Sequence, residues 1–314
     1  MTTHLETPAR VATADGTAPP GTRTRPSRRR PGRATPLRSL AIAVGLVAAA
    51  CLLWEGYKAL GRAFGDVIPG TGLAFPIATT DSAMPHIAQI IEALASPASV
   101  AGGGTLLSYY LVETSVTLRE SLYGMLVGAV IGAVLAVILR EIPLLGRATL
   151  PWLIVSQTIP LVALAPIIVV WVGGAGMPSW IAVTVIAAYL SFFPVTLNTL
   201  TGLNSADPLH VEFLRSIAAP RWRELVHVRI PTALPSFFTG LRLAATASVI
   251  GAIVGELSAG TGAGIGRAIL TAAYYYSLAP ANLYAAILVA SLAGIVFVQI
   301  IVLIEWLTLR KRSS

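Results

Sequence analysis

"SLYGMLVGAVIGAVLAVIL", residues 121–139, is a run of nineteen residues without a charged side chain. A helix of about 20 apolar residues is long enough to cross the ~30 Å hydrocarbon core of a membrane. The rest of the chain has the same character, because 55% of its 314 residues are hydrophobic and only 11% are charged, against roughly 25% charged residues in soluble proteins. The sequence therefore predicts an all-α, polytopic membrane protein.

Five further apolar segments bring the predicted number of membrane spans to six. The six segments cover about residues 40–60, 121–139, 150–172, 178–200, 236–257 and 282–307. Glycine is frequent in the second, fifth and sixth, as expected where helices pack closely in lipid. The third contains Pro151, Pro160 and Pro166. Prolines free backbone carbonyls, so this span is either a broken helix that lines a pathway or a plain kink.

Lysine and arginine are unevenly distributed among the segments that join the spans. With the N-terminus inside, the inner segments carry seventeen of these residues and the outer segments carry four. The positive-inside rule then predicts that both termini are cytoplasmic. Residues 1–38 contain eight arginines and little apolar surface, which predicts a disordered tail ahead of a transmembrane domain at 39–314. Cleavage of a signal peptide before Cys51, the single cysteine, is an alternative that Ala48 disfavours.

The outer segment between the first two spans is long, at about residues 61–120. Within residues 82–94, four apolar residues have helical spacing: Ile87, Ile90, Ile91 and Leu94. Within residues 98–110, the first half is rich in glycine. We expect them to form a loop that leads into a helix along the membrane surface before the second span.

The sequence contains no enzymatic or metal-binding pattern. Its four histidines lack the spacing of metal ligands, and the glycine-rich "GTGAGIGRA" at 260–268 lacks the Lys-Ser/Thr pair that holds nucleotide phosphates. We expect a turn there. The arginine-rich tail does not indicate nucleic-acid binding. The chain is therefore not predicted to be an enzyme, and any energy for transport comes from a partner or an ion gradient.

Polar residues inside the spans are candidates for a transport pathway, because burying charge in lipid is costly. Arg242 and Glu256 both lie in the fifth span, about 21 Å apart along a helix, so they cannot pair with each other. For each, a structural role is an equal alternative. Gln157, ahead of Pro160 in the third span, is a third candidate.

Residues 202–234 form a long inner loop between the fourth and fifth spans. We expect two short helices, at 210–217 and 221–228, with Pro220 in the first turn of the second. Pro231 is expected to end this helix, and Pro235 to begin the fifth span. Trp222, Leu225 and Val226 would share one face. Such a helix lies on anionic lipid or docks on a cytoplasmic protein, and composition does not decide between the two.

The loop resembles the signature E-A-A-x3-G-x9-I-x-L-P of permease subunits of ABC importers. Glu212 matches the glutamate, Ala218 stands at the glycine position, and Val228, Ile230 and Pro231 match the end. The spacing is kept, although the two alanines are replaced by Phe213 and Leu214.

Three flanking stretches are similar to the nitrate, sulfonate and taurine branch of these permeases. They are "PLVALAPIIVVWVG" at 160–173, "FFPVTLNTLTGL" at 192–203 and "VGELSAGTGAGIGRAI" at 254–269. The stretch "SQTIPLVALAP" at 156–166 resembles the subgroup for pyrimidine thiamine precursors or riboflavin. The resemblance covers about residues 70–310.

The resemblance implies a type I importer permease in a bacterial inner membrane, with a small polar solute as its cargo. Its partners would be two ATPase subunits, a second permease in a homodimer, a solute-binding protein and membrane lipid. ATP would bind to the ATPase, so no cofactor is expected in this chain. Glu212, Ala218, Arg221 and Trp222 would lie at or near the ATPase contact. The alternative is an ion-gradient-driven transporter that uses Arg242 and Glu256.

Ala218 is the position at which this chain departs from the signature at its turn. Glycine takes a positive φ at little cost and alanine does not. The replacement is therefore harmless only if the backbone is right-handed there.

Overall fold

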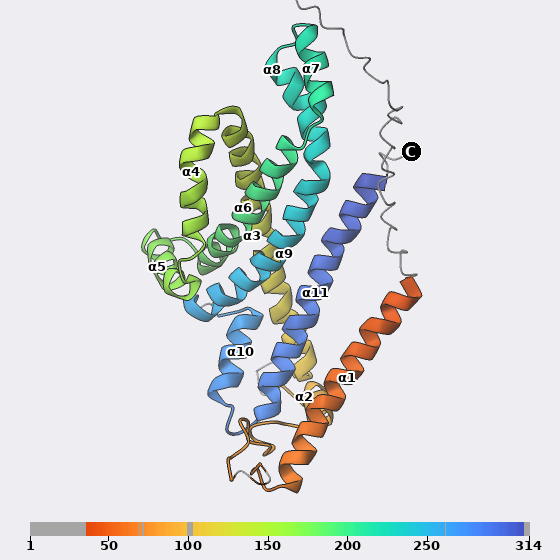
Figure 1. Cartoon of the computed structure of the whole chain (residues 1–314). Coiled ribbons are helices and arrows are strands. Elements are labelled where there is room, and N and C mark those ends of the chain that lie inside the picture. Colours follow the sequence, from red (N-terminus) through yellow and green to blue (C-terminus); the bar gives the residue numbers. More distant parts are fainter. Residues whose placement is uncertain (1–35, 69, 71, 99–102, 261, 311–314) are drawn as a thin grey trace, which may run out of the picture. The chain divides into compact units, whose positions relative to one another are not determined.

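The computed structural model describes residues 36–68, 70, 72–98, 103–260 and 262–310 (Figure 1). Most of the predicted arginine-rich tail lies outside this part. Throughout the described ranges the chain is helical, apart from turns, loops and two isolated β-bridges, Val67–Ala74 and Pro97–Thr105. The all-α prediction is confirmed. Packing divides the chain into two units after Leu52, within α1 (Pro36–Ala63). In the first unit, the side chains at 41–50 are exposed.

Within the described residues, five helices are long and apolar enough to cross a membrane. They are Ala41–Ala63, Leu106–Glu141, Ser179–Asn204, Arg221–Ala259 and Pro280–Arg310. A sixth span is present if α4 (Pro143–Ser156) and α5 (Leu161–Gly174) count as one, and these two helices meet at 98°. The third predicted span is therefore broken, and the break lies at residues 157–160.

The centre of the second unit is formed by α3 (Leu106–Glu141), α6 (Ser179–Asn204) and α9 (Ile230–Ala259), which pack against one another along their lengths. Gly124, Gly128 and Gly132 form one stripe of α3 that faces α6. A Cβ atom at Gly128 would lie 2.8 Å from the Ala188 carbonyl oxygen, and one at Gly132 would lie 2.6 Å from that of Phe192. The glycines thus allow the two backbones to touch, as small residues do between membrane helices.

The segment before the second span differs from the prediction. Residues 106–120 do not form a separate surface helix, because α3 runs without a break from Leu106 to Glu141. Thr105 caps its first turn by accepting a hydrogen bond from the Ser108 N–H at 3.3 Å. The predicted outer helix is present as α2 (Ile87–Ala95).

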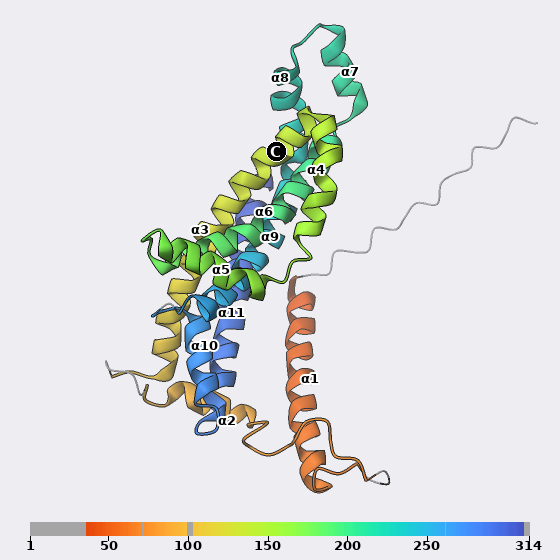
Figure 2. The same cartoon turned by 90° about the vertical axis from the view of Figure 1, so that its left-hand side faces the viewer.

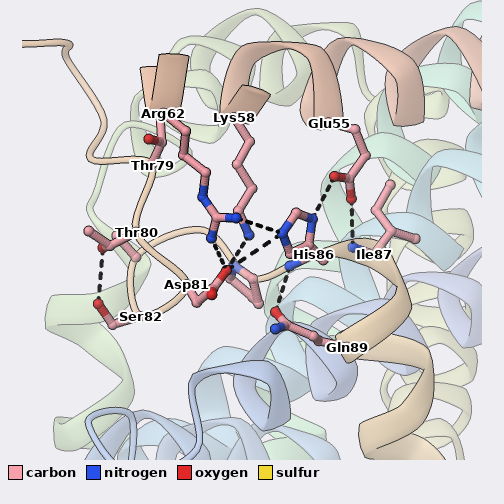
Figure 3. Close-up of polar contacts among 12 residues, drawn as sticks. Glu55, Lys58, Arg62, Thr79, Thr80, Asp81, Ser82, His86, Ile87 and Gln89 are labelled. Atoms are coloured by element: carbon pink, nitrogen blue, oxygen red, sulfur yellow. Dashed lines mark hydrogen bonds and ion pairs between the residues drawn. The ribbon is translucent and has the colours of Figure 1, made fainter. Parts of the chain in front are cut away.

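Charged residues near the end of α1 hold the segment at 79–87 (Figure 3). Lys58 Nζ is fully buried and lies 2.6 Å from Asp81 Oδ1, which Arg62 Nη2 approaches to 2.5 Å. Glu55 lies 2.7 Å from His86 Nδ1 and accepts the Ile87 N–H at 2.9 Å. The hydrogen bond from Lys58, aided by the nearby positive charges, lowers the pKa of Asp81.

The loop between α6 and α9 contains α7 (Pro208–Ser216), α8 (Arg221–Glu224) and η1 (Leu225–Arg229), a π-helix. The prediction that Pro231 ends a helix is wrong, because the helix is continuous from Arg221 to Ala259. A proline ring clashes with the preceding helical turn and lacks an N–H donor. The wider π turn directly before Pro231 makes room for that ring.

Two further helices of the described chain, one short and one long, follow α9. After α9, α10 (Ile265–Tyr274) begins within the stretch 260–268, so the turn expected there is shorter than predicted. The last span is α11 (Pro280–Arg310).

Candidate docking and pathway sites

α7 presents an apolar face that nothing in the described chain covers. Leu209, Phe213 and Ile217 recur at intervals of four residues, which places them on one side of the helix, and they are 70%, 64% and 58% exposed. Trp222 on α8 is 57% exposed. We call these four side chains the apolar tip. Figures 1 and 2 show α7 and α8 beyond the N-terminal end of α9. Clustered exposed apolar side chains of this size mark an interaction surface.

The turn between α7 and α8 is centred on Ala218. Its φ is +52°, in the left-handed region. The Ala218 N–H donates to the Arg215 carbonyl and the Ala219 N–H to the Leu214 carbonyl, both at 3.0 Å. These two bonds define a Schellman motif, in which glycine usually takes the position held here by Ala218. The right-handed conformation that would make the replacement harmless is therefore not the one adopted.

A buried arginine ties the loop to α6. Arg229 is 7% exposed; its Nε lies 2.7 Å from Glu224 Oε1, and its Nη1 donates to the Leu203 carbonyl at 2.9 Å. Glu224 and Arg229 are five residues apart, a spacing that the π-helix brings to the same side of the chain. Sequence reasoning missed this pair, because an α-helical reading places the two on different faces.

The seven residues that carry the signature or the predicted ATPase contact fall into two groups. Glu212 is exposed on α7, Ala218 forms the turn, and Arg221 and Trp222 begin α8. These four lie in the segment formed by α7, the Ala218 turn and α8 (residues 208–224), which we call the projecting loop. The remaining three belong to the base of the long helix: Val228 in η1, and Ile230 and Pro231 in the first turn of α9.

Gln157 and Pro160 lie at the break between α4 and α5. Gln157 ends α4, and Pro160 precedes the first turn of α5. The Tyr189 hydroxyl of α6 donates to the Ser156 carbonyl at 2.6 Å, which satisfies one backbone group freed by the break. In the described part of the chain, Gln157 Nε2 is shielded from solvent and has no hydrogen-bond partner.

Arg242 forms an ion pair with Glu305 of α11. The two contacts are Nε to Oε2 at 2.8 Å and Nη2 to Oε1 at 2.9 Å. The sequence could have predicted this pair, because Glu305 is a charged residue near one end of the sixth predicted span. The pair joins α9 to α11.

Glu256 is fully buried and fastens the turn between α9 and α10. Its Oε2 accepts the Gly266 N–H at 2.7 Å. From α3, Glu113 accepts the Gly264 N–H and Thr117 accepts the Ile265 N–H. Carboxylates here complement the unpaired N–H groups at the start of α10. Gly264 has a φ of +109°, and a Cβ there would overlap the Glu256 carboxylate.

The described ranges contain no group of three or more His, Cys, Asp or Glu side chains that could hold a metal ion.

Comparison with known proteins then gives the family. Residues 124–308 match the family described as "Binding-protein-dependent transport system inner membrane component". The chain belongs to this family. The match takes in α6, α9, most of α11 and the whole of the projecting loop.

The curated relatives of this inner membrane component are transport permeases. The chain is 46% identical over 119 residues to the formylaminopyrimidine transport permease ThiX of Halalkalibacterium halodurans. The matched stretch covers 38% of this chain and 46% of the relative. The chain is 42% identical over 170 residues to the riboflavin permease RibX of Chloroflexus aurantiacus, and the match covers 53% of this chain and 62% of the relative. The putative sulfonate permease SsuC of Bacillus subtilis is 27% identical, covering 52% and 57%. The chain thus matches less than two thirds of the length of each of these relatives, from 46% to 62%.

A solved structure shares the fold. It is a chain of an amino acid ABC transporter crystallised with histidines, with a TM-score of 0.51 and 18% identity, covering 63% of this chain and 94% of the other. At this identity the likeness concerns the fold alone.

Proposed function

We propose that this inner membrane component is the permease subunit of an ATP-driven importer. The observation that carries the proposal is the projecting loop, in which the exposed apolar tip stands beside Glu212 and Arg221. A loop that meets only water has no use for four large exposed apolar side chains. An ATPase subunit docked on the tip would cover them, and Arg229 would transmit its movement to α6. We further propose two permease copies with two ATPases.

The membrane placement that we propose follows the distribution of basic residues. Residues 39–314 form the transmembrane domain in a bacterial inner membrane, both termini are cytoplasmic, and the loop at 202–234 is the cytoplasmic contact. A solute-binding protein would then deliver the solute at the opposite face, near α2 and α10.

The solute that we favour is a pyrimidine thiamine precursor or a riboflavin-type compound. This rests on the two relatives above 40% identity, whose names refer to formylaminopyrimidine and riboflavin. The broken span at Gln157 and Pro160 supplies freed backbone groups and an unpaired amide, and we propose that it lines the passage.

An ion-gradient mechanism has less support. Of its two candidate coupling groups, Arg242 is paired with Glu305, and Glu256 accepts a hydrogen bond from Gly266 through Oε2, while Glu256 Oε1 has no hydrogen-bond partner in the described part of the chain. It also leaves the apolar tip without a partner.

Charge reversal tests the proposed docking. The double variant Glu212→Arg with Arg221→Glu, purified with its cognate ATPase subunit, should weaken the complex and lower the rate of ATP hydrolysis roughly ten-fold, because charge pairs at an interface centre contribute strongly. Affinity is measured by co-purification and titration, and hydrolysis by phosphate release.

The matched control reverses two exposed charges elsewhere, Glu92→Arg on α2 and Arg267→Glu on α10. This control should leave both the affinity for the ATPase and the rate of ATP hydrolysis within two-fold of the wild type, because exposed surface charges contribute little. If the loop variant and the control behave alike, the docking proposal fails.

A further inference from the structure

A polar cavity lies between the base of the projecting loop and the junction of α3 with α4. Its volume is about 540 Å³. Arg140, Glu141 and Pro143 line it from the α3–α4 side, and Arg215, Arg221 and Glu224 line it from the loop. Three arginines thus converge on one hollow from three different elements.

The charge of this cavity is positive. Glu224 is already neutralised by the buried Arg229, which lies 2.5 Å from it, while Arg215 Nε stays 3.8 Å from its other oxygen. Arg140 Nε is shielded from solvent and, in the described part of the chain, has no hydrogen-bond partner. Glu141 offsets one positive charge, so the lining retains a net positive charge.

The start of α4 adds to this preference for an anion. α4 is fourteen residues long, begins at Pro143 on the cavity wall, and has no side chain that caps its first turn. Pro143 has no N–H and the Gly146 N–H donates to the Ile142 carbonyl at 3.0 Å, so the N–H groups of Leu144 and Leu145 are the ones left for phosphate oxygens. The positive end of the α4 dipole lies here too, partly offset by the C-terminal end of α3 at the same wall.

The outer face of α4 continues the site with apolar surface. Leu144, next to the cavity, is 80% exposed, and Trp152 and Val155 further along the same face are 73% and 53% exposed. Spacings of eight and three residues place the three on one side of the helix. A ligand that fits both surfaces has a phosphate at one end and a long apolar chain beside it.

We propose that this cavity binds the phosphate group of an anionic phospholipid, whose acyl chains lie along the exposed face of α4. Arginine suits this ligand because its planar fork pairs with two phosphate oxygens at once. The lipid would join the α3–α4 junction to the loop, next to the docking surface and sharing only Arg221 with it.

The test uses the purified full-length chain in detergent, with lipid binding counted by native mass spectrometry. The probes are phosphatidylglycerol, phosphatidylcholine and inorganic phosphate. The wild-type chain should retain phosphatidylglycerol, and Arg140→Gln with Arg221→Gln should weaken this binding roughly ten-fold, as expected for lost charge-assisted hydrogen bonds. No ATPase is needed, so a failure of ATPase docking does not affect the lipid result.

A matched control removes two nearby arginines that do not line the cavity, Arg147→Gln and Arg223→Gln, and should leave binding within two-fold of the wild type. Leu144→Ser with Trp152→Ser should also weaken phosphatidylglycerol binding. If the cavity double variant does not fold, as judged by size-exclusion chromatography, Arg215→Gln replaces it, because that side chain is 69% exposed.

Three outcomes would overturn the proposal. They are equal losses in the cavity variant and its control, equal retention of phosphatidylcholine, and displacement of phosphatidylglycerol by millimolar inorganic phosphate. The first indicates general attraction to basic residues, the second indicates no headgroup selection, and the third assigns the cavity to a free phosphate.

Discussion

Ala218 shows how a single residue sets the geometry of the docking loop. The chain keeps the left-handed turn that the family signature fills with glycine, although alanine is strained there. A non-glycine residue in this region costs about 1–2 kcal/mol. The Schellman bonds on both sides of the turn hold Ala218 in place despite that cost.

Replacing this residue by glycine should therefore stabilise the turn. Ala218→Gly removes the strain but gives the unfolded chain about 0.4–1 kcal/mol more entropy, which leaves a net gain of roughly 0.5–1 kcal/mol. Amide hydrogen exchange at residues 218 and 219 should slow by a factor of about 2–5. The control Ala219→Gly, at a position without positive φ, should speed exchange. If Ala218→Gly also speeds exchange, the turn is not strained.

A pH dependence is expected at Asp81. Its pKa is lowered in the folded state by the hydrogen bond from Lys58, so its contribution to stability is complete above the unfolded value of about 3.8. That contribution is lost as pH falls through the lower, folded value, because the protonated carboxyl no longer pairs with the buried Lys58.

Exchange at residues 79–87, after correction for the intrinsic dependence of amide exchange on pH, should therefore rise only below about pH 4. Asp81→Asn should show the raised exchange already at pH 7. Protection that is the same in the variant and the wild type at pH 7 would contradict this role for Asp81.

At the scale of elements, the contact between α3 and α6 depends on a ladder of glycines. Gly128→Leu should destabilise the fold by roughly 1–3 kcal/mol or more, because the side chain has no space beside the Ala188 carbonyl. Val130→Leu, on a side chain that is 64% exposed, should change stability by less than about 0.5 kcal/mol. Thermal unfolding in detergent measures both, and equal unfolding temperatures would refute the close packing.

The elements also show what sequence could and could not predict. Runs of apolar residues predicted the spans and α2, because length and helical period are local properties. The third span illustrates the limit: Pro160 predicted a break or a kink, but neither the 98° angle nor the hydrogen bond from Tyr189 of a different helix could be predicted from this segment alone. Likewise, Pro231 predicted a helix end, but the π turn directly before it lets the helix continue.

At the scale of the whole chain, residues distant in sequence decide the site. The signature spacing predicted that residues 212–222 form one loop. It could not predict the partners that fix this loop and its neighbours, such as Leu203 for Arg229 or Glu305 for Arg242, because those contacts follow from how the helices pack. Ala218 was rightly singled out, but only the backbone angle decided how it is accommodated.

The central claim is that the projecting loop docks on an ATPase, and site-directed cross-linking tests it most directly. In a Cys51→Ser background, Trp222→Cys would carry a thiol-linked photo-cross-linker, and Glu92→Cys would serve as the control. We expect the membrane complex with its cognate ATPase to give a cross-linked product from position 222 and none from position 92. Equal products from both positions, or none from position 222 in an intact complex, would contradict the account.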